Sequence, residues 1–231
     1  MIDFHTHSLF SDGELLPSEL VQRARMKGYQ GIAITDHVDA SNLDQVVSSL
    51  VKVCPVLSSS WQITVLPGVE ITHAPPEVIS RLAQAARSLG ASIVVVHGET
   101  IVEPVPPGTN AAALDAAVDI LAHPGLITPE LAAKAKERSI FLEITSRNGH
   151  SLTNGHVARL AMEKGAPLLI NTDAHKATDL IDDATARRIL RGAGIGEEHL
   201  PQILNHSRSI LERIGSSSFR ERGRNGAAQA L

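Results

Sequence analysis

Histidines and carboxylates repeatedly follow short apolar segments in this 231-residue chain. Imidazole together with carboxylate is the ligand mixture of Zn²⁺, Mn²⁺ or Fe²⁺, whereas Ca²⁺ takes oxygen ligands. Six histidines and three carboxylates exceed what one ion can use, so the set suits two or three ions. The candidate metal ligands are His5, His7, Asp12, His37, Glu70, His97, His123, Asp173 and His175.

Two pairs of these candidates have a spacing that favours chelation. His5 and His7 stand two residues apart, as do Asp173 and His175. Residues with this spacing at the end of a strand can point toward the same side. Each pair could therefore offer two ligands to one ion.

The other histidines and one aspartate are weaker candidates. Asp36 has two interpretations, a further ligand or a partner that orients His37. His73 stands three residues past Glu70 and keeps a possible role in the pocket. We expect ordinary capped or solvated side chains at His150, His156, His199 and His206.

A serine or cysteine nucleophile is a poorer interpretation of the sequence. The Gly-x-Ser-x-Gly motif is absent, and Cys54 stands in a helical stretch before Pro55. This single cysteine excludes an internal disulfide and favours a reducing compartment. The first residues have neither the basic start nor the apolar stretch of a secretory signal, so we expect a cytoplasmic protein.

Seven apolar, β-branched segments must position the candidate ligands. Their continuous apolar character is typical of strands buried on both faces of a parallel sheet. With helical patterns between them, they predict a parallel α/β barrel of the (βα)7 type, in which all the strand carboxyl ends converge on one face. A doubly wound open sheet is the alternative fold. The segments span residues 2–4, 31–35, 62–66, 92–96, 118–121, 140–144 and 167–171.

Several predicted helices have recognisable ends. One begins at Pro17 and is closed by Gly28, and Thr128 caps another. Asn154 and Gly165 bracket a third in the same way. We expect one domain over residues 1–215 and a disordered tail over residues 216–231, which are rich in Ser, Gly, Arg and Ala.

Composition narrows the classes of partner. Lys and Arg number 21 against 25 Asp and Glu, giving a formal net charge of −4, and aromatic residues make up 3% of the chain. This balance provides no basic track for long nucleic acid and few aromatic platforms for bases. No apolar run approaches the roughly 20 residues of a membrane span.

Over about residues 1 to 180, the sequence resembles the polymerase-and-histidinol-phosphatase (PHP) family of metal-dependent phosphoesterases. The motifs that carry the resemblance appear in the family's order: His-Thr-His-x4-Asp-Gly, Thr-Asp-His, Pro-Gly-Val-Glu, Val-His-Gly, Ala-His-Pro and Thr-Asp-Ala-His. The resemblance implies a distorted seven-stranded barrel that holds up to three ions. It places the first ion on His5, His7, Glu70 and Asp173. It places the second on Glu70 as a bridge, with His97 and His123. It places the third on Asp12, His37 and His175, where the carboxylate of Asp12 favours Mn²⁺ or Fe²⁺ over Zn²⁺.

The resemblance also implies an activity. We expect a phosphomonoesterase similar to histidinol-phosphate phosphatases, with Glu70, Asp173 and His175 as catalytic residues. Two close metals would supply a bridging hydroxide near neutral pH. The alternatives are a phosphodiesterase or exonuclease that acts on nucleotides or short RNA, and a metal-binding domain without catalysis.

Two cations follow the predicted strands and could bind a small phosphorylated substrate. Arg147, after the sixth strand, could hold a phosphate through two hydrogen bonds. Lys176, next to His175, is an equal candidate, and Glu99 and Asn110 are weaker ones.

Overall fold

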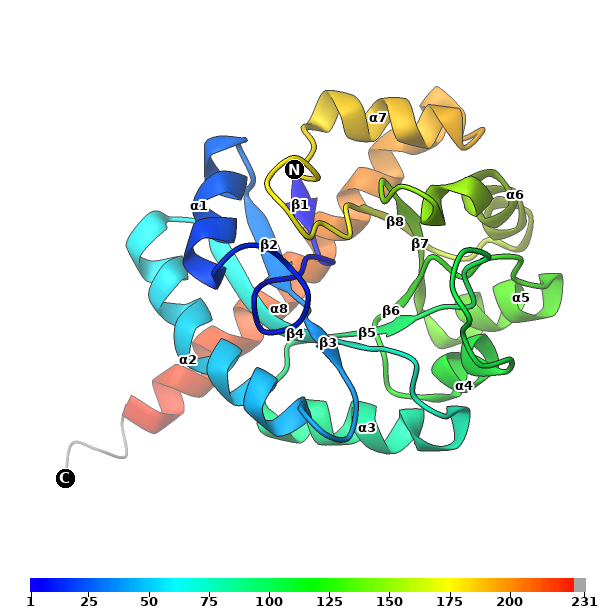
Figure 1. Ribbon diagram of the computed structural model, residues 1–231. Coiled ribbons are helices and arrows are strands. Elements are labelled where there is room, and N and C mark those ends of the chain that lie inside the picture. Colours follow the sequence, from blue (N-terminus) through cyan, green and yellow to red (C-terminus); the bar gives the residue numbers. More distant parts are fainter. Residues whose placement is uncertain (227–231) are drawn as a thin grey trace.

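Seven parallel strands form a nearly closed barrel in the computed structural model, which describes the backbone of residues 1–226 and the side chains of residues 1–214 (Figure 1). Neighbouring strands follow one another in chain order, and the short β3 (His37–Val38) pairs with β4 outside this path. The predicted parallel barrel is confirmed, and the doubly wound alternative is wrong because the strand order never reverses. The barrel strands are β1 (Ile2–Asp3), β2 (Gly31–Ile34), β4 (Thr64–Ile71), β5 (Ile93–His97), β6 (Ile120–Ala122), β7 (Phe141–Thr145) and β8 (Leu168–Asn171).

The barrel closes between β1 and β8 through a few bonds beyond the strands themselves. The Phe4 amide donates to Asn171 Oδ1 at 3.0 Å, and the Asp173 amide donates to the carbonyl of His5 at 2.9 Å. The His7 amide donates to the carbonyl of Ala174 at 2.8 Å. These bonds hold the first and last strand ends together, so candidate ligands from both ends of the sequence meet.

Helices surround the barrel on its outer face (Figure 1). Valine, isoleucine and leucine from the strands pack outward against them, which is the packing that explains the continuous apolar runs. The surrounding helices are α1 (Pro17–Met26), α2 (Leu43–Trp61), α3 (Pro76–Leu89), α4 (Thr109–Asp115), α5 (Pro129–Arg138), α6 (Asn154–Lys164) and α7 (Asp183–Gly192). Two short 3-10 turns, η1 (His150–Thr153) and η2 (Glu197–His199), precede α6 and α8.

The predicted helix caps are partly confirmed. Thr128 accepts a hydrogen bond from the Leu131 amide at 3.3 Å, as an N-cap should. Asn154 begins α6 but does not cap it. Its side chain instead accepts from the Thr145 amide at 3.2 Å and donates to the Thr145 carbonyl at 2.8 Å. Asn154 therefore fastens α6 to the end of β7.

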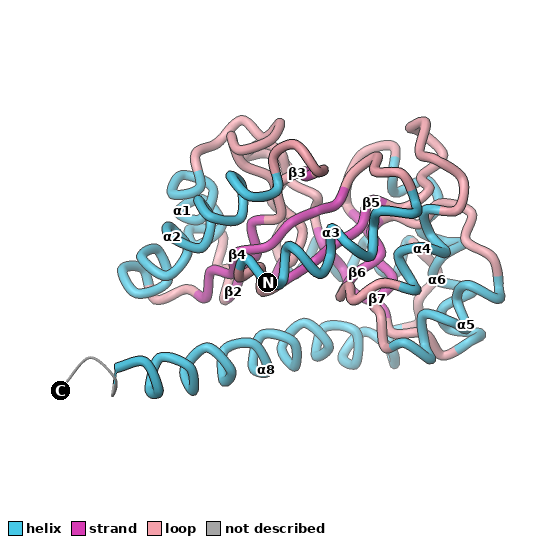
Figure 2. The backbone as a smooth tube through the Cα atoms, turned by 90° about the horizontal axis from the view of Figure 1, so that it is seen from below, coloured by secondary structure: helices cyan, strands magenta, loops and turns pink. Residues whose placement is uncertain are grey.

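Helix α8 (Leu200–Gly226) lies across the end of the barrel where the strands begin (Figure 2). Its Ile210 is buried, and Leu211 and Ile214 pack with it against the apolar interior of the barrel. The helix continues to Gly226, past the start of the expected tail, and residues 227–231 lie outside the described residues. Disorder of that tail stays a prediction. Among the described residues, no helix combines the length and the apolarity that a membrane crossing needs.

Candidate metal centre

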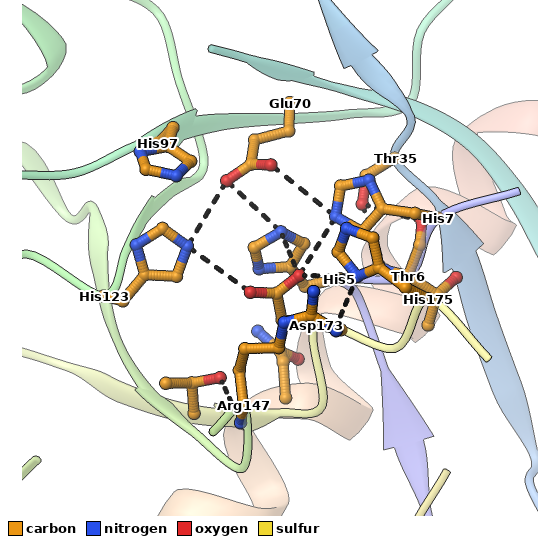
Figure 3. A network of polar contacts seen from close by, with 12 residues as sticks. His5, Thr6, His7, Thr35, Glu70, His97, His123, Arg147, Asp173 and His175 are labelled. Atoms are coloured by element: carbon orange, nitrogen blue, oxygen red, sulfur yellow. Dashed lines mark hydrogen bonds and ion pairs between the residues drawn. The ribbon is translucent and has the colours of Figure 1, made fainter. Parts of the chain in front are cut away.

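All nine predicted ligands gather at the carboxyl ends of the strands, at the end of the barrel opposite α8. They fall into overlapping groups within which the ligand atoms lie no more than 4.8 Å apart. Figure 3 shows imidazoles and carboxylates from separate strand ends pointing toward a common centre. Residues spread along the sequence from His5 to His175 thus form one cluster, as the predicted topology requires.

The inner part of this cluster consists of His5, His7, Glu70 and Asp173, all buried. His5 Nε2 lies 3.2 Å from Glu70 Oε1, and His7 Nε2 lies 3.2 Å from Asp173 Oδ1. His5 Nε2 is also 3.7 Å from Asp173 Oδ1. Two ligands about 2.1 Å from a tetrahedral ion lie roughly 3.4 Å apart, so this spacing suits a shared ion.

Several buried atoms of the cluster lack a hydrogen-bond partner among the described residues. They are His5 Nε2, both ring nitrogens of His7, both oxygens of Glu70, His123 Nδ1 and Asp173 Oδ1. A buried polar atom without a partner costs about 1–3 kcal/mol, and native proteins keep few of them. All seven atoms belong to predicted ligands, and bound cations would satisfy the carboxylate oxygens and those ring nitrogens that carry a lone pair. The residues therefore fit a centre of more than one metal ion.

Asp12, His37 and His175 form a more exposed part of the cluster beside His7, in agreement with the expected third set. His175 Nε2 lies 3.1 Å from Asp12 Oδ1, and His37 Nε2 lies 3.5 Å from the same oxygen. The side chain of Asp12 is 59% exposed. This ligand set opens toward solvent, whereas the inner set does not.

The expected second set, Glu70 with His97 and His123, is only partly brought together. His123 Nε2 lies 3.6 Å from Glu70 Oε1. His97 Nε2 instead lies 3.1 Å from Glu103, a residue that sequence reasoning missed. Glu103 stands in the loop after β5, away from any strand end, and no motif singles it out.

His150 was expected to be an ordinary capped or solvated side chain, and this prediction is wrong. It is buried, and its ring stacks on that of His123 with centroids 4.2 Å apart. His97, His123 and His150 form a further group that could hold a metal. The turn η1 folds His150 back over the strand ends, and its only signal in the sequence is its place soon after β7.

The buried carboxylate of Glu143 supports the cluster without joining it. Glu143 Oε1 lies 2.8 Å from His5 Nδ1 and accepts from Asn171 Nδ2 at 2.9 Å, so it orients the His5 ring. Sequence reasoning missed Glu143, although a charged residue inside an apolar strand is a usable signal.

Asp36 orients a loop rather than His37. It accepts hydrogen bonds from the amide and hydroxyl of Ser8, both at 2.7 Å, and from the Ser11 hydroxyl at 2.8 Å. His37 Nδ1 instead lies 2.6 Å from Thr72 Oγ1. Asp36 therefore shapes the loop that presents Asp12. Among the described residues its contacts support neither of the two interpretations offered for it.

Burial and mutual attraction shift the titration of these groups in opposite directions. Burial raises the pKa of Asp173 to about 7 against the pull of His5. Burial also acts to raise the pKa of Glu70, but His5 and His37 outweigh it and hold that pKa well below its ordinary value. Burial holds the pKa of His7 well below its ordinary value, with His37 adding to the effect. Neutral imidazole and ionised carboxylate are the forms that bind metal, so these shifts favour ligation by His7 and Glu70 and oppose it for Asp173.

A polar cavity of about 460 Å³ opens above the cluster. Asp12, His37, His97, Asp173 and His175 line it, and so does Arg147. Val38 is the one aliphatic side chain among the described lining residues, and no Phe, Tyr or Trp lines the cavity. Such a lining suits a small, hydrophilic substrate.

The two predicted substrate cations have different positions. Arg147 reaches this cavity while its Nη1 pairs with Asp179 Oδ2 at 3.3 Å. Lys176 is exposed and lines a neighbouring cavity instead, so the structure does not bring it to the cluster. Glu99 and Asn110 bond to each other's backbone amides, at 2.8 Å and 3.0 Å, and brace a loop away from the cavity lining.

The remaining histidines have separate surroundings. His73 lines the cavity, and its Nε2 donates a hydrogen bond to Glu103 Oε2 at 3.2 Å. His156 Nε2 lies 2.8 Å from the Ile127 carbonyl, and His206 Nδ1 lies 2.9 Å from the Leu168 carbonyl. The first bond ties α6 to the loop before α5, and the second ties α8 to β8. His199 is exposed, 3.5 Å from Glu198, as expected for a solvated side chain.

Known proteins resemble this chain along most of its length. An uncharacterized protein of Methanocaldococcus jannaschii is 51% identical over 215 residues, which are 92% of this chain and 99% of that protein. A probable phosphatase of Shewanella pealeana is 29% identical over 234 residues, covering 91% of this chain and 90% of that protein.

Two solved structures share the fold. One is a chain of archaeal ribonuclease P with mature tRNA, with a TM-score of 0.69, 16% identity, and coverage of 91% of this chain and 90% of that one. The other is histidinol phosphate phosphatase from Lactococcus lactis with zinc, L-histidinol and phosphate, with a TM-score of 0.62, 18% identity, and coverage of 84% and 94%. The sequence profile of the PHP domain matches residues 3–184. The chain therefore belongs to the PHP domain family.

Proposed function

We propose that this protein is a metal-dependent phosphoester hydrolase that acts on a small phosphomonoester and uses two or three divalent ions, Zn²⁺, Mn²⁺ or Fe²⁺. One observation carries the proposal. Seven buried nitrogen and oxygen atoms without partners among the described residues lie together beneath a polar cavity. The names of two similar proteins, a probable phosphatase and a histidinol phosphate phosphatase, support the same class of reaction.

Divalent ions bound in such a centre lower the pKa of water and polarise phosphate oxygens. The protein's own residues prepare the place for this chemistry. Glu143 holds the ring of His5 through Nδ1 and leaves Nε2 facing the centre. The loop that Asp36 fixes through Ser8 and Ser11 presents Asp12 to His175. His5 and Asp12 are therefore oriented before substrate arrives.

Arg147 is the residue proposed to receive the phosphate. Its guanidinium lines the cavity together with Asp173 and His175, and its side chain is 30% exposed. Asp179 pairs with Nη1 at 3.3 Å, which leaves the other guanidinium donors for phosphate oxygens. A planar cation held in this way can grip two oxygens at once.

The lining of the cavity favours a monoester over a nucleic-acid strand. Bases need aromatic faces on which to stack, and no Phe, Tyr or Trp stands among the described lining residues. Three divalent ions would also turn the formal charge from −4 to +2, which would attract a small anion.

A second candidate function follows from the fold comparison with ribonuclease P. The matched chain belongs to an assembly with tRNA. A chain with this fold could therefore serve as an RNA-associated protein without catalysis of its own. Titration of labelled structured RNA with the purified protein tests this candidate, which predicts salt-dependent binding with a Kd below about 1 μM. The phosphatase proposal predicts no such binding.

The proposed activity is tested with chelator-stripped protein reloaded with Mn²⁺, Zn²⁺ or Fe²⁺. The measurement is phosphate release from a panel of phosphorylated metabolites, with dinucleotides and short RNA in parallel. Metal-dependent release from a monoester that Asp173→Asn abolishes supports the proposal. His199→Gln is the control, because His199 is exposed and away from the cavity. Release only from dinucleotides or RNA, or no release with any metal, would contradict the proposal.

A further inference from the structure

A carboxylate and three imidazoles meet at one side of the cavity. The sequence predicts no ligand role for two of these four residues, Glu103 and His150. Glu103 oxygens lie 3.1 Å from His97 Nε2, 3.2 Å from His73 Nε2 and 3.3 Å from His150 Nε2. The side chains of His97 and His150 are only 3% and 7% exposed, and that of Glu103 is 37% exposed. Two buried rings therefore face one carboxylate at the rim.

Hydrogen bonding determines which nitrogen of His97 is free. Nδ1 lies 3.2 Å from the carbonyl oxygen of Gly98. A carbonyl can only accept, so Nδ1 carries the proton and Nε2 of the neutral ring presents a lone pair. In the neutral, metal-binding form of the ring, this lone pair faces a carboxylate oxygen of Glu103 at 3.1 Å. A divalent ion shared by the two atoms would satisfy both acceptors.

The alignment of the contacts distinguishes two kinds of pair. His73 and Glu103 form an aligned hydrogen bond, the ordinary contact of a histidine with a carboxylate. His97 and His150 lie at ion-pair distance from Glu103 without hydrogen-bond alignment. The inner pair of His5 with Glu70 has the same combination of short distance and absent hydrogen bond. Ligands that share an ion point at the ion rather than at each other.

We propose that Glu103 and His150 are metal ligands, and that with His97 they hold one divalent ion at the side of the centre formed by β5 and β7. Two imidazoles and a carboxylate are a donor set for Zn²⁺, Mn²⁺ or Fe²⁺. Thr100 Oγ1, 2.8 Å from His150 Nδ1, orients that ring as a supporting residue commonly does for a metal ligand. The inference rests on the proposed function only in requiring a metal centre.

The test measures Zn²⁺ bound to the full chain, after stripping with a chelator and dialysis against a series of fixed free Zn²⁺ concentrations. Elemental analysis compares the wild type with Glu103→Gln and His150→Gln. We expect each variant to bind one ion fewer than the wild type, or to bind that ion at least about tenfold more weakly. The matched control is Glu198→Gln, which removes an exposed carboxylate 3.5 Å from His199 and should keep the wild-type content.

The outcomes separate this inference from the proposed function. A wild type that binds no Zn²⁺ overturns both. A wild type that loads normally while both variants keep its Zn²⁺ content and affinity overturns only the role of Glu103 and His150. His150 is buried, whereas Glu103 is partly exposed. If far-UV circular dichroism shows that His150→Gln does not fold, the result for Glu103→Gln alone decides the test.

Discussion

The two ends of the barrel have opposite chemistry. Where the strands begin, apolar side chains fill the interior, and α8 covers them with Ile210 and its neighbours. Where the strands end, the interior becomes polar and contains atoms that lack partners among the described residues. The change takes a single step along the chain, since Phe4 belongs to the apolar interior and His5 to the cluster. One end thus stabilises the fold, while the polar atoms that form the binding site at the other end lower its stability.

Glu70→Gln should have the largest effect, because Glu70 faces both His5 and His123 and is expected to bridge two ions. We expect loss of more than one metal equivalent and a fall in kcat/KM of at least about 10³-fold, since electrostatic stabilisation is usually the largest part of catalysis. Elemental analysis and phosphate-release kinetics measure the two effects. Wild-type metal content in this variant would show that Glu70 is not a bridge.

Ile210→Ala should affect stability without affecting the metal centre. Ile210 is 3% exposed and fills the apolar end of the barrel, so its truncation should cost about 2–5 kcal/mol of unfolding free energy. Thermal or denaturant unfolding measures this loss, and metal content at 25 °C should stay at the wild-type level. Met26→Ala is the control, because Met26 is 73% exposed, and it should change stability by less than about 0.5 kcal/mol. A loss of metal in folded Ile210→Ala would break the separation of the two ends.

Arg147→Ala should weaken substrate capture without loss of metal. A charged hydrogen bond contributes about 1.5–3 kcal/mol, which corresponds to roughly 10- to 150-fold in kcat/KM. The loss should appear mainly in KM, and Arg147→Lys should recover only part of it because lysine cannot form the planar double contact. Arg159→Ala, which removes an exposed arginine paired with Glu163, is the control. A change under about twofold in Arg147→Ala would remove the phosphate role.

Glu143→Gln tests whether the buried support of His5 tunes the centre. The carboxylate lies 2.8 Å from His5 Nδ1, and loss of such a partner typically lowers metal affinity by 10- to 100-fold. Competition with a chelating dye measures this affinity. Equal affinities for the variant and the wild type would mean that Glu143 only fills space.

The sequence predicts the fold and nine of the clustered residues well because both depend on local order. Predicted ligands such as His97, the last residue of β5, and Asp173, two residues past β8, stand at strand ends. Parallel topology brings strand ends together whatever the loops do. Glu103 and His150 could not be predicted in the same way. Their positions depend on how a loop and a 3-10 turn fold over the barrel mouth, which periodicity does not report.

The sequence also does not predict the roles of the supporting residues. Asn154 has the sequence context of a helix cap but bonds to the end of β7, because the packing of α6 on the barrel decides its partner. His206 looked like a solvated side chain, yet its ring bonds to the carbonyl of Leu168 and fastens α8 to β8. Local patterns indicate where an element begins, whereas tertiary packing decides what its polar side chains bind.

We propose that the polar end of the barrel is a centre for more than one metal ion. The most direct measurement is elemental analysis of wild-type protein that has been stripped with a chelator, reloaded and dialysed. The arrangement of His5, His7, Glu70 and Asp173 beside the more exposed set of Asp12, His37 and His175 predicts two or three divalent ions per chain. One ion or fewer per folded chain, with Mn²⁺, Zn²⁺ and Fe²⁺ each supplied in excess, would show that the polar end of the barrel does not hold several ions.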